Sequence, residues 1–231
     1  MYILGVITAR GGSKRLPGKN VKVLAGKPLI GYVIEAAHSS AVLNQTILST
    51  DSEIISCVAS AFSIEIPFMR PEELSQDTAS SEDVLRHAVE FIELKGQKVD
   101  VVVLLQPTSP FTSGKMVDDC VDELIKNSWD SVITVLSPSK RCEWIGIDQE
   151  GRFDYIVFPE QRKQLRTKKE VVPSGNVYAI TREALFKNQS IISDKTGIVY
   201  VSHEVGIDID YQADFDFAEF LILKKKIINK G

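Results

Sequence analysis

Apolar, β-branched runs alternate with amphipathic segments along most of the chain. Val99–Leu105 and Ser131–Leu136 are apolar almost throughout, which is typical of central strands buried on both faces of a sheet. Residues 81–93 instead carry apolar side chains at helical spacing. The pattern predicts strands over residues 2–8, 45–49, 64–66, 99–105, 131–136, 175–180 and 198–201, and helices over residues 29–39, 52–61, 80–94, 114–127 and 211–229.

This alternation predicts an α/β fold, a doubly wound and mostly parallel sheet covered by helices. Residues 137–174 interrupt it, because they are rich in charge and carry isolated aromatic side chains. An insertion of this length is usually functional or an interface, and the alternative is a surface loop. We therefore expect an α/β core of residues 1–136 and 175–231 with an insertion of residues 137–174.

Composition narrows the class of protein. The chain has 231 residues, 44% of them hydrophobic, with a net charge of −4, which argues against general nucleic-acid binding. Its three cysteines are odd in number and form no C-x-x-C pair, so neither a disulfide framework nor a zinc site is indicated. With no signal-peptide pattern and no long apolar run, we expect a cytoplasmic protein without a membrane partner.

The loop Thr8–Asn20 directly follows the first apolar run. Glycines let backbone N–H groups close on phosphate oxygens, and cations neutralise them. Ligands of open parallel sheets bind at the carboxyl ends of strands, where this loop begins. The loop therefore predicts a polyphosphate site, and its cations and glycines are Arg10, Lys14, Arg15, Lys19, Gly11, Gly12 and Gly18.

The loop is neither of the two common phosphate motifs. A Walker A motif fails because five residues separate Gly12 from Gly18 and Asn20 stands where the hydroxyl should be. No G-x-G-x-x-G is present. We expect a triphosphate, with Arg10 and Lys14 on the β- and γ-phosphates and Lys19 nearer the α-phosphate. Arg15 faces either the phosphates or solvent, and a merely solvated basic loop is the alternative.

Asp208 and Asp210 are the second candidate cluster. In an extended segment, residues two apart project to the same face, so Ile207 and Ile209 would point into the core. Two carboxylates beside a triphosphate predict a Mg²⁺ site, because Mg²⁺ takes oxygen ligands and bridges to phosphates. The alternative is an ordinary strand with an acidic solvent face. Asp214 and Asp216 are expected at the start of the last helix, where they suit its dipole.

Several motifs together resemble the acylneuraminate cytidylyltransferases, the CMP-sialic acid and CMP-nonulosonate synthetase family. The resemblance implies a Rossmann-like fold of the nucleotide-diphospho-sugar transferase type. It also implies a homodimer in which residues 137–174 reach over the partner's site. These enzymes couple CTP to a 2-keto sugar acid and release pyrophosphate. The motifs are Thr8–Asn20, Ser49–Asp51, Arg70–Pro71, Asp77–Ser81, Leu105–Pro110 and Ile207–Asp210.

The resemblance also implies roles for single residues. Catalysis would rest on Arg10, Lys14, Lys19, Asp208 and Asp210. The nucleotide would contact Ala9, Arg10, Gly11, Gly12, Ser13, Lys14, Lys19, Asn20, Arg70 and Ser81, and the sugar would contact Gln106, Pro107, Thr108, Ser109 and Tyr178.

Some of these residues have plainer interpretations. Arg70 could be a surface cation, and Ser81 could be only a helix N-cap. Asp51 could likewise cap the helix that follows it. Tyr178 could be a buried strand tyrosine, and residues 106–110 could be a strand-exit turn.

One segment departs from the family pattern. The sialic-acid enzymes carry Arg-Pro-Asn-Gly-Ala where this chain has Val172-Pro-Ser-Gly-Asn176. A modified nonulosonate such as legionaminate or pseudaminate is therefore open as the acceptor. Two rival functions are a nucleotidyltransferase for another acceptor such as Kdo, and a non-catalytic nucleotide-binding module. The Lys19-Asn20 ending argues against the first, and the intact charged residues argue against the second.

Overall fold

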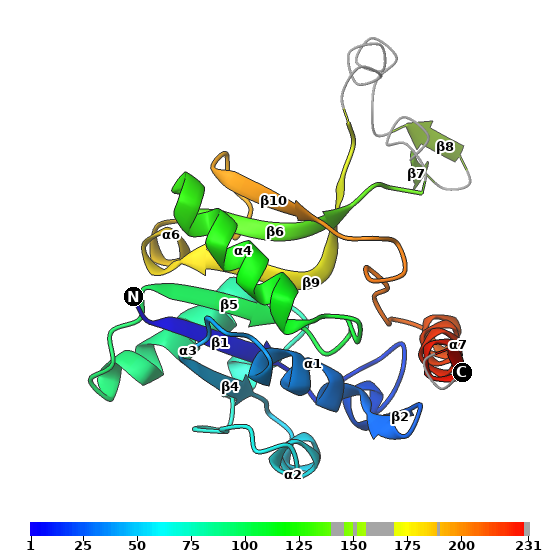
Figure 1. Ribbon diagram of the computed structural model, residues 1–231, viewed down its shortest axis with the longest axis horizontal. Coiled ribbons are helices and arrows are strands. Elements are labelled where there is room, and N and C mark those ends of the chain that lie inside the picture. Colours follow the sequence, from blue (N-terminus) through cyan, green and yellow to red (C-terminus); the bar gives the residue numbers. More distant parts are fainter. Residues whose placement is uncertain (140–145, 150–151, 156–168, 189, 229–231) are drawn as a thin grey trace.

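A six-stranded sheet in the order β10-β6-β9-β5-β1-β4 forms the centre of the molecule (Figure 1). The computed structural model describes residues 1–139, 146–149, 152–155, 169–188 and 190–228. β1 pairs in parallel with β4 and β5, and β10 pairs in parallel with β6, whereas β9 is antiparallel to both β5 and β6. The strands are β1 (Ile3–Thr8), β4 (Gln45–Ser49), β5 (Val101–Leu105), β6 (Ser131–Leu136), β9 (Val172–Thr181) and β10 (Thr196–Tyr200).

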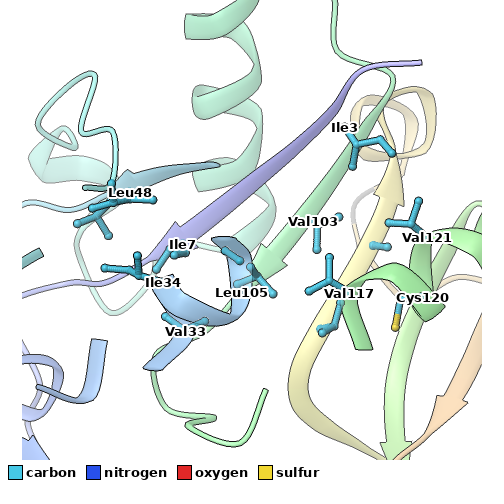
Figure 2. Close-up of a cluster of buried hydrophobic side chains, with 14 of the residues drawn as sticks. Ile3, Ile7, Val33, Ile34, Leu48, Val103, Leu105, Val117, Cys120 and Val121 are labelled. Atoms are coloured by element: carbon cyan, nitrogen blue, oxygen red, sulfur yellow. The ribbon is translucent and has the colours of Figure 1, made fainter. Parts of the chain in front are cut away.

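Helices cover both faces of this sheet, because each central strand is apolar on both sides. In β5, Val103 and Leu105 join a cluster with α1 (Leu29–His38), α2 (Glu53–Ser60) and α4 (Gly114–Asn127). Figure 2 shows this cluster between the sheet and the helices. Val102 and Leu104 point to the other face and pack with α3 (Ser81–Leu94) and α6 (Arg182–Lys187). The expected doubly wound, mostly parallel architecture is confirmed.

Serine caps set the starts of three helices. The hydroxyl oxygens of Ser52, Ser80 and Ser113 accept hydrogen bonds from the backbone N–H groups three residues later, at the starts of α2, α3 and α4. The last helix, α7 (Gln212–Ile228), begins beside Asp214, whose carboxylate accepts from the backbone N–H of Tyr211. The expected place of Asp214 at this helix start is therefore confirmed.

Most expected elements occur, with small differences at their ends. Residues 64–66 contribute only an isolated bridge, from Glu65 to Ile47. β9 begins at Val172, three residues before the expected strand. Elements that the sequence pattern did not predict are α6, β2 (Val23–Leu24), β3 (Lys27–Pro28), η1 (Lys19–Val21), η2 (Glu72–Leu74) and two strands within the insertion.

Within the insertion, β7 (Gly146–Gln149) and β8 (Arg152–Tyr155) form a two-stranded antiparallel sheet of their own. Figure 1 shows this pair set apart from the central sheet. Most of the other residues of the 137–174 insertion, and Cys142, lie outside the described residues. Among the helices that the structure describes, none combines the length and apolar character that a membrane crossing requires.

Candidate active site

Four chain segments meet at one edge of the sheet. β1, β4 and β5 are parallel neighbours, so the loops that follow them begin at the same edge. β9 runs the other way, and its amino end therefore reaches this edge too. The loop after β1, the turn after β5 and the start of β9 are thus brought together, as is usual for ligand sites in open α/β sheets.

A cavity of about 560 Å³ opens at this edge. The predicted phosphate loop forms one wall, and the turn after β5 forms another. Its lining residues are Thr8, Arg10, Ser13, Lys14, Arg15, Leu16, Lys19, Asn20, Asp77, Gln106, Pro107, Thr108 and Asp210. Hollows of about 540 and 740 Å³ lie elsewhere, near Asp100 and Thr181. The cavity of about 560 Å³ is the candidate site because of its cationic lining and its place at the strand ends, since volume does not distinguish the three cavities.

Two side chains hold the phosphate loop in shape. The Asp51 carboxylate accepts a 2.8 Å hydrogen bond from the backbone N–H of Gly11. The buried Asn20 side chain donates to the carbonyl of Arg10 at 3.0 Å. Asp51 does not cap α2, because Ser52 does. A Cβ at Gly11 would stand 3.1 Å from Cβ of Ser52, a tight contact that Ser52 would have to relieve by a small shift. Ala9, Gly12 and Ser13 complete this loop, and the Ala9 N–H donates to the Ser49 carbonyl.

Arg10 and Lys14 share one carboxylate partner, Asp77. Arg10 Nη1 lies 2.8 Å from one oxygen of Asp77, and Lys14 Nζ lies 2.5 Å from the other. Lys14, and then Arg10, hold the pKa of the Asp77 carboxyl below its ordinary value. Sequence reasoning gave Asp77 no role, although it opens the Asp77–Ser81 motif. Its acidic side chain within that motif was the available signal, and its contact with the distant loop became visible only in the structure.

Lys19 behaves differently from the other loop cations. Its side chain is only 12% exposed, and its ammonium donates to the Ile209 carbonyl at 2.6 Å and to Asp210 at 3.2 Å. Arg15 lies 2.8 Å from the second oxygen of Asp210 and stacks over the Tyr211 ring. Arg15 is 56% exposed and lines the larger cavity, so it is open to solvent as expected while it also contacts Asp210. Asp210 is therefore held by two cations.

The Asp208–Asp210 segment shows the expected alternation, but outside any strand. Ile209 is fully buried in a cluster at the base of α7, and its N–H donates to the Thr108 carbonyl. Although much of Asp208 is exposed, withdrawal of its carboxyl from water raises its pKa above the ordinary value. Asp210 adds to this rise, while Thr108 and Lys19 oppose it. The described residues contain no cluster of three or more potential metal-binding side chains.

A second, smaller cavity of about 270 Å³ adjoins the first. Arg70 and Ser81 line it, as does Ser80. Arg70 is not a surface cation, because it is buried and donates to the hydroxyl and carbonyl of Ser49. Burial lowers the pKa of Arg70 to about 10. Ser81 is not the N-cap of α3, because Ser80 takes that position, which leaves the Ser81 hydroxyl without that role.

Of the residues expected to contact the sugar, some line the larger cavity and others are buried away from it. Gln106, Pro107 and Thr108 line the larger cavity. Ser109 is fully buried beneath them, and its hydroxyl has no hydrogen-bond partner in the described structure. Tyr178 packs partly buried against the α3 face of the sheet, and its burial, with the nearby Asp208, raises its pKa. The structure thus brings three of these five residues to the cavity wall.

The segment that departs from the family pattern is mostly interior. Ser174 and Asn176 are buried and hydrogen-bond each other, Thr134 and Thr112. Gly175 between them has a φ of +83°. A Cβ there would stand 3.1 Å from the Ser109 hydroxyl and 3.8 Å from Cγ of Asp208. Glycine at this position therefore leaves space beside the carboxylate pair.

Comparison with known proteins agrees with this arrangement. A family model described as "Cytidylyltransferase" matches residues 4–216. The chain is 37% identical to CMP-N,N'-diacetyllegionaminic acid synthase of Legionella pneumophila, over 96% of this chain and 97% of that one. It is 30% identical to pseudaminic acid cytidylyltransferase of Campylobacter jejuni, over 96% of each chain.

Solved structures show the same fold. One is a CMP-2-keto-3-deoxy-manno-octonic acid synthetase complexed with CTP, with a TM-score of 0.71 at 19% identity, covering 97% of this chain and 100% of that one. A second is a 4-diphosphocytidyl-2C-methyl-D-erythritol synthase from Anaerococcus prevotii, with a TM-score of 0.62 at 15% identity, covering 96% and 98%. Because the family model spans most of the chain and two relatives match it nearly end to end, this protein belongs to the cytidylyltransferase family.

Proposed function

We propose that this enzyme transfers the cytidylyl group of CTP to the anomeric hydroxyl of a nonulosonate, a nine-carbon 2-keto sugar acid. The oxygen of that hydroxyl bonds to the α-phosphorus, the bond to pyrophosphate breaks, and the hydroxyl proton is released. The observation that carries the proposal is the contact of Lys19 with the Ile209–Asp210 segment. It joins a cationic phosphate loop to a carboxylate pair in one cavity.

The loop cations would bind the triphosphate. Arg10 and Lys14 are exposed and suit the β- and γ-phosphates, whose charge grows as pyrophosphate leaves. Lys19 is fixed by its two contacts and suits the α-phosphate beside the carboxylates. The smaller cavity, with Arg70 and Ser81, would hold the cytosine and ribose. Positioning of this kind supplies much of the rate in nucleotidyl transfer.

We propose Asp208 and Asp210 as the residues that hold Mg²⁺. They fit the ion because both offer hard carboxylate oxygens and alternate around the buried Ile209. Two protein ligands suffice, since Mg²⁺ usually completes its shell with water and phosphate oxygens. When bound, the ion would supply Lewis acidity at the α-phosphate. Asp210 would then exchange its contact with Arg15 for the metal.

The acceptor class follows from the relatives rather than from the cavity alone. The 37% identical relative is named for N,N'-diacetyllegionaminate and the 30% identical one for pseudaminate. We propose an acceptor of the legionaminate or pseudaminate kind, bound near Gln106 and Thr108. We also propose a cytoplasmic homodimer joined through residues 137–174. The free thiols Cys57 and Cys120 are compatible with a reducing compartment.

The test is pyrophosphate release from CTP and Mg²⁺ with a panel of acceptors. The panel is N,N'-diacetyllegionaminate, pseudaminate, N-acetylneuraminate, Kdn and Kdo. We expect release with N,N'-diacetyllegionaminate or pseudaminate and a matching CMP-sugar by mass spectrometry. Release with Kdo alone would overturn the acceptor class, and CTP binding without release for any acceptor would overturn the activity.

Metal removal tests the carboxylate pair. Chelation should abolish turnover of the wild-type enzyme, and added Mg²⁺ should restore it. Asp208→Asn should lower kcat by roughly 10²-fold or more and shift the Mg²⁺ dependence to higher concentration. Asp216→Asn, an exposed carboxylate on α7 that contacts only Gln212 among the described residues, is the matched control. An unchanged Mg²⁺ dependence in Asp208→Asn would contradict the metal assignment.

A further inference from the structure

Asp77 occupies an unexpected place in a site built to bind phosphate. Its carboxylate contacts both cations that we assign to the β- and γ-phosphates, one with each oxygen. The Asp77 side chain comes from the segment that follows Arg70, far from the phosphate loop in sequence. A carboxylate bound by a guanidinium and an ammonium has the charge and donor contacts of a phosphate group.

The Arg10–Asp77 ion pair lies between the two cavities. Arg10 and Asp77 line both the larger cavity of about 560 Å³ and the smaller one of about 270 Å³. Thr8 and Gln106 are the other residues common to both linings. A ligand with its base in the smaller cavity and its phosphates in the larger one must pass this pair. Asp77 therefore stands where the two parts of a nucleotide would join.

The ion pairs of Asp77 are more open to water than the ion pair between Lys19 and Asp210. The side chains of Arg10, Lys14 and Asp77 are 39%, 78% and 49% exposed. Ion pairs this open to water are weak, because water and salt screen them. Lys19 instead is nearly buried and also bound to a backbone carbonyl. Incoming phosphate can thus replace Asp77 at little cost, while Lys19 keeps its position.

We propose that Asp77 is an internal counter-anion that occupies the triphosphate-binding cations in the empty enzyme and yields them to the phosphates of the bound nucleotide. This rests on the proposed function, since it requires that Arg10 and Lys14 bind the nucleotide. Displacement of Asp77 would also open the partition between the cavities. After transfer, the returning carboxylate competes with pyrophosphate for the same two cations and speeds its departure.

The experiment compares wild type with Asp77→Asn, which keeps the size and removes the charge. Calorimetry measures the binding of inorganic pyrophosphate and of CTP at fixed Mg²⁺ and low salt. Stopped-flow competition measures the rate at which pyrophosphate dissociates. Asp77→Glu keeps the competing charge. Asp119→Asn removes an exposed carboxylate that pairs with Lys115 on α4, and is the matched control.

We expect Asp77→Asn to bind pyrophosphate roughly three- to tenfold more tightly, with a correspondingly slower dissociation, because two screened ion pairs no longer compete. The Asp77→Asn variant should also bind CTP more tightly than wild type. Asp77→Glu and Asp119→Asn should stay within about twofold of wild type. Unchanged or weaker pyrophosphate binding in Asp77→Asn would overturn the proposal, and weaker binding would assign Asp77 to orienting the cations instead.

The design separates this inference from the function beneath it. Wild-type turnover of CTP, with no gain of affinity in Asp77→Asn, overturns only the role of Asp77. Absence of both CTP and pyrophosphate binding in the wild type overturns the proposed function and this inference together. Melting temperatures of all variants show that altered binding does not come from unfolding.

Discussion

Lys14 and Lys19 belong to the same loop but do different work. The Lys14 side chain is 78% exposed and forms an ion pair with Asp77, whereas Lys19 is nearly buried and bound to Ile209 and Asp210. A lysine bound to water on most sides can be replaced without harm to the fold. A buried lysine that satisfies a carbonyl and a carboxylate cannot, because its loss removes this donor from the Ile209 carbonyl and leaves Asp210 with Arg15 alone.

This difference gives a prediction about two alanine variants. Lys14→Ala should raise KM for CTP roughly tenfold and leave the melting temperature within about 1 °C, because it removes an exposed phosphate contact. Lys19→Ala should lower the melting temperature by several degrees, in line with a loss of about 1–3 kcal/mol, and lower kcat as well. Calorimetric melting and steady-state kinetics measure both. Equal melting temperatures for the two variants would contradict the assignment.

For single residues, the sequence indicated the chemistry of the candidate site better than it indicated which side chains contact each other. Glycines and cations in one loop predicted a phosphate site, because local composition carries that information. It could not show that Arg15 turns to Asp210 or that Arg10 meets Asp77, since both contacts join distant segments. Nor could it show that Ser174 and Asn176 are buried. Ser174 and Asn176 are therefore poor candidates for direct contact with the acceptor, whereas Val172 is exposed.

The elements follow the hydrophobic pattern closely where that pattern is long. β5, β6, α3 and α4 match their predicted spans within about two residues at each end. The hydrophobic pattern did not predict short elements such as α6, because α6 follows β9 directly and no loop separates the two. It also does not encode strand direction, so the antiparallel course of β9 emerged only from the structure.

One ion pair joins elements that the site depends on. Arg182, at the start of α6, donates from Nε and Nη2 to the two oxygens of Glu93 near the end of α3, each at 2.9 Å. Arg182 is the first cause that lowers the pKa of Glu93, with the Val99 N–H contributing and burial opposing. Because the folded pKa is depressed, this stabilisation is present above the unfolded pKa of Glu and is lost as pH falls through the folded one.

Glu93→Gln should therefore lower the free energy of unfolding by about 1 kcal/mol at pH 7, a modest figure because the pair is partly screened by solvent. The difference from wild type should shrink as pH falls below the ordinary range for Glu. Urea titrations at pH 7 and at a pH below the ordinary pKa of Glu measure it. Glu90→Gln, one turn earlier and exposed, is the control and should change stability by less than about 0.5 kcal/mol. A pH-independent difference would show that the charge of Glu93 is not its source.

The whole molecule combines a central sheet with a separate small sheet, β7–β8, in the insertion. Its core is two clusters, one on each face of the sheet, and a third at the base of α7. α7 also exposes Phe217, Phe220 and Leu223. Composition and pattern were enough to expect one α/β body with an appendage.

We predict that the protein sediments as a dimer at micromolar concentration. Replacement of residues 140–168 by a short Gly-Ser linker should give a monomer that still binds CTP, because the phosphate loop and the smaller cavity lie in the core. Analytical ultracentrifugation and calorimetry measure the two properties. A monomeric full-length protein would contradict the role proposed for the insertion.

The path of β9 connects the insertion to the space beside Asp208. The strand leaves the insertion and, within four residues, passes Gly175 beside Asp208 and Ser109. Because β9 continues from the insertion into the sheet, a change in the course of this strand would alter the space beside Asp208. If the insertion joins two subunits as proposed, assembly and acceptor choice would be linked through this strand. Grafting a foreign insertion onto this core would thus retune the pocket even with every lining residue preserved.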